Sequence, residues 1–322
     1  MRAIVIREQG APDVLKLEDV PEPAAGPGQV LIRTEAVGVS YSEMSLRSGA
    51  YPMVAPMPAV FGFEAAGTVT ATGEGADPTL TGRRLVVMNT GFGSYAEYVV
   101  ADADTVTEVP NAVSSRDAVA VANMGAVALC LMRAARLTAS ETVLVEAAAG
   151  GVGGYLMQFL RARRQGRVIA TGGSRAKRDE ALKLGADAVF DHGDPAWPEK
   201  VRDALDGATL DVVFESIGGT AAGRLLDAMT PGTGRMLLYG MLSGPPAVAP
   251  LDLLTHNLTL TGCGGLTVWL SDVRKARADI LAMAASGQLR PRIDSVLPLA
   301  EAAEAHRRFE DRRAIGKIVL VP

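Results

Sequence analysis

The sequence predicts an α/β protein in which a doubly wound parallel sheet is inserted into a barrel-like β domain. Short strand-like runs, broken by Gly and Pro, fill the chain from Met1 to about Ala112. Strands and helices then alternate from Thr142 onward, as is typical of a parallel sheet covered by helices. The chain ends in the apolar run 317–321. Because a strand needs a partner strand, we expect this run to return to the first domain.

The first domain is predicted to contain several short strands joined by Gly-rich turns. The turn Gly26-Pro27-Gly28 precedes an extended run at 30–37. Further strands are expected at 67–71, 84–88 and 95–100. Ser114 and Ser115 then precede an Ala-rich stretch, 117–136, which should be a helix with a serine N-cap.

The second domain is predicted to be a parallel sheet. Its first strand, 142–147, runs into a segment whose apolar residues recur at helical spacing. Those residues are Val152, Leu156, Phe159 and Leu160. Later strands are expected at 167–171, 188–191, 211–215 and 235–240, with helices at 177–184 and 198–205. The run 258–261 is expected near the edge of the sheet, where a second copy of the chain could join it.

Composition excludes several classes of protein. With 322 residues, 32 basic and 36 acidic side chains and a net charge of −4, the chain lacks the basic excess of a nucleic-acid-binding protein. We find no run of about 18 uncharged apolar residues, so no membrane span is expected. Two cysteines, Cys130 and Cys263, cannot build a disulfide framework or a four-thiolate zinc site. A cytoplasmic location is therefore expected.

A glycine-rich turn after the first parallel strand predicts a dinucleotide site. In the pattern G-x-G-x-x-G, Ala148, Gly150 and Gly153 take the three small positions. They allow a tight turn, a close approach of the pyrophosphate, and packing of helix on strand. A tight turn without a ligand is the alternative, which the flanking strand and helix disfavour.

The end of the next strand indicates NADPH rather than NADH. An NAD enzyme usually places Asp or Glu about 20 residues after the glycines to bind the ribose hydroxyls. Here no carboxylate appears before Asp179, whereas Ser174, Lys177 and Arg178 could bind a 2′-phosphate through charge-assisted hydrogen bonds. The alternative is that these cations form a solvated helix face.

These motifs resemble the zinc-independent quinone oxidoreductase, or zeta-crystallin-like, family of the medium-chain dehydrogenases and reductases. The matching stretches are 26–30, 38–40, 49–52, 64–67, 93–99, 147–153, 185–187 and 316–322. The resemblance implies a GroES-like substrate domain at 1–120, a Rossmann NADPH-binding domain at 121–261, and a return to the substrate domain at 262–322. It also implies a homodimer.

The resemblance assigns cofactor-binding positions one by one. They are Gly150, Gly151, Val152 and Gly153 in the pyrophosphate loop; Gly173, Ser174, Lys177 and Arg178 around the 2′-phosphate; His192 beside the adenosine ribose; Gly240, Met241, Cys263, Gly264 and Gly265 on the nicotinamide side; and Lys317 near the C-terminus. His192 stands where the family often has Tyr, and it could bond the phosphate or cap a loop.

No metal is expected at the active site. Ser40 and Phe63 stand where the zinc-dependent relatives have Cys and His ligands, and neither side chain binds zinc well. Hydride transfer must then depend on positioning and on hydrogen bonds to the developing oxyanion. Ser40, Tyr41 and Tyr51 are the candidate catalytic residues for holding the substrate oxygen. Glu43 stands where the family has Asp and is expected to order a loop.

The function expected from these features is reduction of a small, apolar carbonyl substrate, a quinone or a related conjugated carbonyl, with NADPH and without metal. An enoyl or enone reductase of secondary metabolism is the first alternative. A second alternative, from another class, is a structural or regulatory protein that binds NADPH with little turnover. No nucleic-acid or membrane partner is expected.

Overall fold

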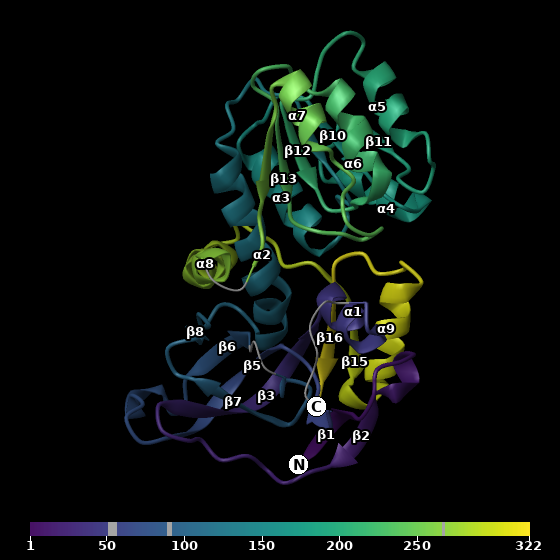
Figure 1. Cartoon of the computed structure of the whole chain (residues 1–322). Helices are drawn as coiled ribbons and strands as arrows, with labels where there is room; N and C mark the ends of the chain where they lie inside the picture. The colour runs from purple at the N-terminus through teal and green to yellow at the C-terminus, as the bar shows by residue number, and fades with distance from the viewer. Residues whose placement is uncertain (51–56, 89–91, 266–267) are drawn as a thin grey trace. The chain divides into compact units, whose positions relative to one another are not determined.

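The computed structural model describes residues 1–50, 57–88, 92–265 and 268–322. The described chain packs into two units, one made of Met1–Asn123 with Arg277–Pro322 and the other of Met124–Ala276 (Figure 1). Both divisions fall inside helices, α2 (Ser115–Ala135) and α8 (Val268–Ala285). The domain boundaries expected from sequence, after residues 120 and 261, come earlier in the chain than these two divisions, after residues 123 and 276. Composition does not change at the point inside a continuous helix where packing changes, so the sequence does not mark it.

The first unit is built on β-sheets. Its strands are β1 (Arg2–Ile6), β2 (Lys16–Asp19), β3 (Gln29–Val39), β4 (Ala59–Val60), β5 (Glu64–Thr72), β6 (Arg84–Met88), β7 (Tyr98–Asp102), β8 (Thr107–Glu108), β15 (Ile293–Pro298) and β16 (Lys317–Val321). Its own helices are α1 (Tyr41–Ser48) and α9 (Ala302–Glu310), with 3-10 turns at Pro12–Val14, Pro78–Leu80 and Leu299–Glu301.

Among the described residues, two sheets share these strands. The smaller sheet has the order β2-β1-β4, and the larger has the order β15-β16-β3-β5-β6-β8, with β7 also paired to β3. The last strand, β16, pairs antiparallel with β3, in the register Ile318 to Val39. The expected return of the final strand to the first domain is therefore confirmed.

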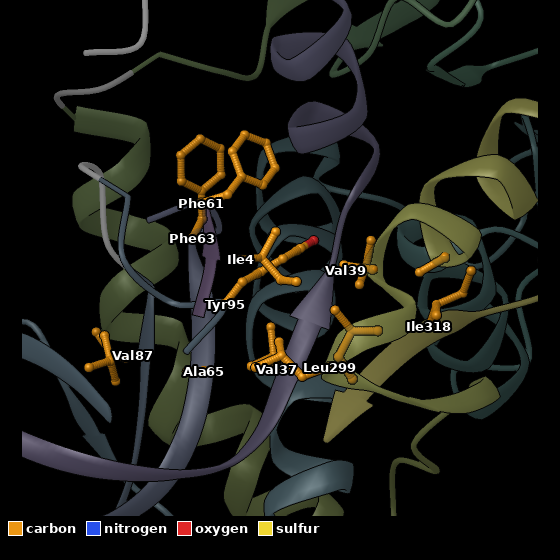
Figure 2. Close-up of a cluster of buried hydrophobic side chains, with 14 of the residues drawn as sticks. Ile4, Val37, Val39, Phe61, Phe63, Ala65, Val87, Tyr95, Leu299 and Ile318 are labelled. Atoms are coloured by element: carbon orange, nitrogen blue, oxygen red, sulfur yellow. The ribbon is translucent and has the colours of Figure 1, made fainter. Parts of the chain in front are cut away.

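The predicted strand at 95–100 begins later, at Tyr98. The backbone of Tyr95 instead bonds to Ile4 and Phe61, at 2.8 Å each, and so joins the smaller sheet. The side chain of Tyr95 enters the apolar core of the unit and is fully buried. Figure 2 shows its ring and hydroxyl oxygen among Ile4, Phe61 and Val39.

The second unit is a doubly wound α/β domain. Its strands are β9 (Val143–Val145), β10 (Val168–Thr171), β11 (Ala188–Phe190), β12 (Val212–Glu215), β13 (Arg235–Leu238) and β14 (Thr259–Gly262). Its helices are α3 (Gly151–Ala162), α4 (Arg175–Lys183), α5 (Trp197–Ala204), α6 (Gly219–Leu225) and α7 (Pro250–His256), with a 3-10 turn at Leu226–Ala228.

All described strands of this unit run parallel, in the order β11-β10-β9-β12-β13-β14. The chain builds outward from β9 in one direction and then returns to build outward from β12 in the other. The point of reversal, between β9 and β12, is where open α/β sheets bind ligands, beyond the carboxyl ends of the strands.

Helix α2 is, by length and composition, apolar enough to cross a membrane. It has 21 residues, and 67% of its most apolar window is buried inside the protein. Core helices of globular proteins have the same composition, so this is weak evidence for a membrane span.

Candidate functional site

The turn between β9 and α3 has the geometry expected of a pyrophosphate loop. Ala147 adopts a left-handed conformation, with φ of +47°, and its carbonyl accepts a 2.8 Å bond from the Gly150 N–H. Helix α3 then begins at Gly151. A Cβ added to Gly153 would lie 2.5 Å from the Ala147 oxygen, which is closer than real Cβ atoms approach backbone. Glycine is therefore required there for the helix to pack on the turn.

The N-terminus of α3 is fixed in place by its apolar face. Leu156, Phe159 and Leu160 are buried, as the helical spacing predicted, whereas Val152 is only half-buried. The first backbone N–H groups of any α-helix have no acceptor within the helix, and the helix dipole makes that end favourable for anions. This end of α3 can therefore bind a phosphate group.

The turn between β10 and α4 carries the predicted 2′-phosphate residues. Ser174 is the N-cap of α4, and its hydroxyl accepts a 3.3 Å bond from the Lys177 N–H. A Cβ at Gly173 would lie 2.5 Å from His192 Nε2, so His192 packs directly against this turn. The Nδ1 of His192 lies 3.0 Å from the Thr171 hydroxyl. Sequence positions 171–177 and 192 thus form one cluster.

Arg178 belongs to the same cluster but already has an anionic partner. Its guanidinium forms a 2.5 Å ion pair with Asp191, and its side chain is 28% exposed. Sequence reasoning missed Asp191, which follows β11 directly. The signal available was a carboxylate at the end of a neighbouring parallel strand, where it reaches the same edge of the sheet.

The predicted nicotinamide-side residues follow β13 and β14. A Cβ at Gly240 would lie 2.7 Å from the Ser216 oxygen, so the loop after β13 approaches the end of β12 closely. Met241 is 44% exposed, and Cys263 is buried. Gly264 and Gly265 are exposed, and Gly265 has a φ of +99°.

The predicted cofactor residues of the second unit therefore meet at one edge. The segments 150–153, 173–178, 192, 240–241 and 263–265 follow the carboxyl ends of β9, β10, β11, β13 and β14. Because parallel strands end together, residues far apart in sequence become neighbours along this edge. Lys317, by contrast, is part of the first unit.

Two buried carboxyl groups lie at the point of chain reversal. Glu146 follows β9, Glu215 ends β12, and both are 0% exposed. An oxygen of Glu146 accepts bonds of 2.8 Å from the N–H groups of Ser216 and Ile217, and Glu215 accepts one from Gly218. Burial, followed by the charge of Glu215, raises the pKa of Glu146 well above its usual range. Burial also raises the pKa of Glu215, so both shifts favour protonated carboxyl groups in this pair.

In the first unit, Lys317 forms a buried ion pair. Its Nζ lies 2.6 Å from Glu64 Oε2, and each side chain is 3% exposed. A Cβ at Gly38 would lie 2.6 Å from that carboxylate and 2.7 Å from Lys317 Cε. Glycine at position 38 leaves the space in which the pair forms. The predicted cofactor contact of Lys317 stays a prediction.

Ser40 and Tyr41 lie at the start of α1, a helix that sequence reasoning did not predict. Ser40 is the N-cap, and Glu43, fully buried, accepts a 2.6 Å bond from its N–H and a 2.9 Å bond from its hydroxyl. The pattern Ser-x-x-Glu is the sequence signal of a capping box and could have revealed this helix. Tyr41 is 37% exposed. Tyr51 lies outside the described residues.

Glu43 is the centre of a buried polar cluster. Its Oε1 accepts a 2.7 Å bond from the Phe63 N–H, and its Oε2, which Ser40 contacts, also accepts a 3.2 Å bond from the Tyr95 hydroxyl. Tyr95 in turn lies 3.3 Å from His306 Nε2. Burial raises the pKa of Glu43 to about 7, although the Lys317 charge and the bonds from Phe63 and Ser40 oppose the shift.

No group of three or more His, Cys, Asp or Glu side chains placed to hold a metal ion occurs within the described ranges. Ser40 and Phe63 stand at the two positions where zinc-dependent relatives are expected to have ligands. Here the Ser40 hydroxyl contacts Glu43, and the Phe63 backbone N–H donates to the same carboxylate.

Comparisons with known proteins cover the whole chain. Residues 26–111 match the family profile of the alcohol dehydrogenase GroES-like domain, and residues 184–320 match a profile described as zinc-binding dehydrogenase. The quinone oxidoreductase of Sus scrofa is 32% identical over 324 residues, which cover 100% of this chain and 98% of that protein. The chain belongs to the quinone oxidoreductase family of the medium-chain dehydrogenases and reductases.

Solved structures agree with this membership. An Escherichia coli quinone oxidoreductase complexed with NADPH superposes with a TM-score of 0.90 at 27% identity, with complete coverage of both chains. A mycobacterial protein, Rv1454c, complexed with NADPH, gives a TM-score of 0.89 at 33% identity, again with complete coverage. The fold expected from the sequence, a Rossmann sheet inserted in a GroES-like domain, is confirmed. As a member of this family, the protein is an oxidoreductase.

Proposed function

We propose that this oxidoreductase uses NADPH to reduce quinones or related conjugated carbonyl compounds by hydride transfer, without a metal. The observation that carries the proposal is the convergence of five cofactor-type loops at the carboxyl edge of one parallel sheet. Relatives named quinone oxidoreductase, and solved relatives that contain NADPH, support the same conclusion.

The second unit fits the cofactor. Gly150 and Gly153 leave the β9–α3 turn without side chains, and the N-terminus of α3 is suited to the pyrophosphate. Ser174 and Lys177 at the start of α4 would hold the 2′-phosphate. When bound, the reduced nicotinamide supplies the hydride, while the protein orients it and the acceptor.

The substrate side of the proposal rests on the first unit. Ser40 and Tyr41 present hydroxyl groups at the N-terminus of α1, and Tyr51 follows that helix in sequence. A hydroxyl donor placed at the acceptor oxygen stabilises the charge that develops there as hydride arrives. The substrate class is a small apolar carbonyl compound.

We extend the proposal to a homodimer located in the cytoplasm. Strand β14 lies at the edge of the parallel sheet, and α7 before it exposes Leu251 by 64% and Leu254 by 76%. An open strand edge beside exposed apolar side chains is a favourable place for a second copy. Light scattering on the purified protein measures its oligomeric state, and a monomer at micromolar concentration would contradict the dimer.

The function is tested by following NADPH oxidation with benzoquinone, phenanthrenequinone and an enone in parallel, with NADH as the control cofactor. We expect turnover of the quinones with a preference for NADPH. Turnover of the enone alone would instead identify an alkene reductase. Tight binding of NADPH without oxidation by any acceptor would contradict the proposed reaction.

A further inference from the structure

The cluster around Glu43 contains a carboxyl group that can hold a proton and a hydroxyl group, that of Ser40, that can pass it on. The carboxyl group is fully buried, yet it touches Ser40, which is half-buried at the N-terminus of α1. The apolar residues around the cluster, including Ile4, Phe61 and Val39, exclude water from its inner side (Figure 2). Ser40 is therefore the contact of Glu43 that leads outward.

The contacts of Glu43 decide where a proton on it can go. The N–H groups of Ser40 and Phe63, at 2.6 and 2.7 Å, donate only and cannot accept a proton. The hydroxyl groups of Ser40 and Tyr95, at 2.9 and 3.2 Å, can both accept. Tyr95 is fully buried behind the carboxyl group. Ser40 is the nearer acceptor and the more accessible one.

The charge state of Glu43 also sets the direction of the Ser40 hydroxyl. When Glu43 is ionised, Ser40 donates its proton inward, as in the observed bond. When Glu43 is protonated, it donates to Ser40 Oγ, and the proton of Ser40 turns away from the carboxyl group. Only the protonated state of Glu43 leaves the Ser40 proton to be donated elsewhere, to the Ser42 hydroxyl, whose Oγ lies 3.0 Å from Ser40 Oγ, or to another molecule.

The surrounding charged groups leave Glu43 as a group that changes state near neutral pH. Lys317 on β16 faces it and is paired with Glu64 on β5. Burial, followed by the charge of Arg47 on α1, lowers the pKa of His306 on α9 to about 3. Burial raises the pKa of Tyr95 well above its usual range. His306 and Tyr95 thus both stay neutral while Glu43 titrates.

We propose that Glu43 supplies, through the Ser40 hydroxyl, the proton that completes reduction of the acceptor; this inference rests on the proposed function. Hydride transfer breaks the C4–H bond of the reduced nicotinamide, and the acceptor gains two electrons and becomes an anion. The anion takes the proton from Ser40 Oγ as Ser40 takes one from Glu43. The Glu43 carboxylate that remains is held by the Ser40 and Phe63 N–H groups and recovers a proton from water between turnovers.

The test compares the pH dependence of kcat for the wild type and for Glu43→Gln, with NADPH and the best acceptor of the assay above. The wild-type kcat should fall as pH rises through about 7, because the proton donor is then lost. In Glu43→Gln, kcat should drop by about 100-fold and no longer respond to pH in this range. NADPH affinity should not change.

Two further variants separate proton supply from a purely structural role. Tyr95→Phe removes one donor to the carboxylate, so the fall in kcat should move to higher pH while the fold is kept. Glu35→Gln is the matched control, because Glu35 accepts bonds from the Thr68 and Ser115 hydroxyls in the same unit, outside this cluster. It should keep the wild-type pH profile.

The outcomes distinguish the proposed proton relay, from Glu43 through Ser40 to the acceptor, from the reduction reaction itself. A wild-type protein that reduces neither quinones nor enones overturns the proposed function and the relay with it. An active wild type whose pH profile is unchanged by Glu43→Gln or by Tyr95→Phe overturns the relay alone. A Glu43→Gln protein that fails to fold leaves the decision to the Tyr95→Phe profile.

Discussion

Glu146 and Glu215 place two carboxyl groups in the interior of the parallel sheet domain, at the point where the chain reverses direction. Such a pair is stable only while it stays partly protonated, since two buried like charges repel. Its N–H donors at Ser216, Ile217 and Gly218 fix the turn after β12. The pair therefore links the stability of this edge to pH.

The first residue-scale prediction concerns the pH dependence of stability. A carboxyl group whose pKa is raised by folding stabilises the protein fully below its unfolded pKa, and that contribution is lost as pH rises through the folded pKa. Glu146→Gln replaces this carboxyl group by a side chain that stays neutral at every pH. Relative to wild type, its free energy of unfolding should rise by up to about 1.4 kcal/mol per pH unit, from the ordinary glutamate pKa upward to the raised pKa of the folded state.

Urea unfolding at several pH values between 5 and 9 measures this difference. Comparison with Glu146→Gln removes the similar contribution of Glu43, which both proteins share. A constant difference between the two proteins across this range would contradict the raised pKa of Glu146.

The second residue-scale prediction concerns cofactor choice. If Lys177 binds the 2′-phosphate, Lys177→Ala should weaken NADPH by about 10- to 100-fold and leave NADH nearly unchanged, because only NADPH carries that group. Arg175→Ala is the control, since that side chain is 91% exposed on the same helix. Dissociation constants from fluorescence titration decide the question, and an equal loss for both cofactors would exclude this role of Lys177.

The sequence predicted the polar residues of the site less completely than its glycines. Gly150, Gly153 and Gly173 were predictable because each must avoid a close backbone or side-chain contact. Asp191 was not recognised as a partner, and Glu43 was expected only to order a loop, since their contacts depend on which chain segments the fold brings together. A buried charge becomes apparent only once the strands that enclose it are placed.

At the scale of elements, the sequence predicted the strands of the second unit and its helices α3, α4 and α5, but not the short helices α6 and α7. Its β-α alternation and apolar spacing hold because one face of each helix packs on the sheet. Helix α1 was missed because it buries Glu43 and Arg47 alongside Leu46, which disrupts the apolar pattern. Its charged residues are buried because each has a partner, Ser40 for one and Glu310 for the other.

The packing of α3 on the turn after β9 gives an element-scale prediction. In Gly153→Ala, the new Cβ would meet the Ala147 oxygen at 2.5 Å, so the helix must move away from the strand. We expect a loss of about 1–3 kcal/mol in stability and a lower Tm. Weaker NADPH binding should accompany it, since the phosphate-binding end of the helix moves.

Gly151→Ala is the matched control for stability. Its Cβ would meet only the Met124 side chain, at 3.3 Å, and a flexible thioether can move aside. Differential scanning calorimetry should show a clearly lower Tm for the alanine at 153 than for the alanine at 151. Equal Tm values would mean that the close approach at 153 is not needed for packing.

At the scale of the whole molecule, the first unit is assembled from the two ends of the chain. Strand β16 lies between β15 and β3, and its residues Ile318, Val319 and Leu320 are fully buried. Burying an aliphatic side chain contributes about 1.5–3 kcal/mol. Three of them together approach the total stability of a typical domain, about 5–15 kcal/mol.

A chain that ends at Gly316 should therefore fail to fold its first unit. Limited proteolysis should cleave residues 1–123 of this variant rapidly, whereas a chain that lacks only the exposed Pro322 should resist like wild type. Resistance of both shortened chains would show that β16 is dispensable for that unit.

The late arrival of β16 also has a consequence for biosynthesis. Strand β3 keeps its edge at Val37–Val39 without its final partner until about 280 further residues have left the ribosome. At roughly 5–20 residues per second, that interval lasts roughly a quarter of a minute to a minute. Throughout it, the nascent chain presents an apolar strand edge, so the N-terminal segment is the part of this protein most exposed to wrong strand pairing during translation.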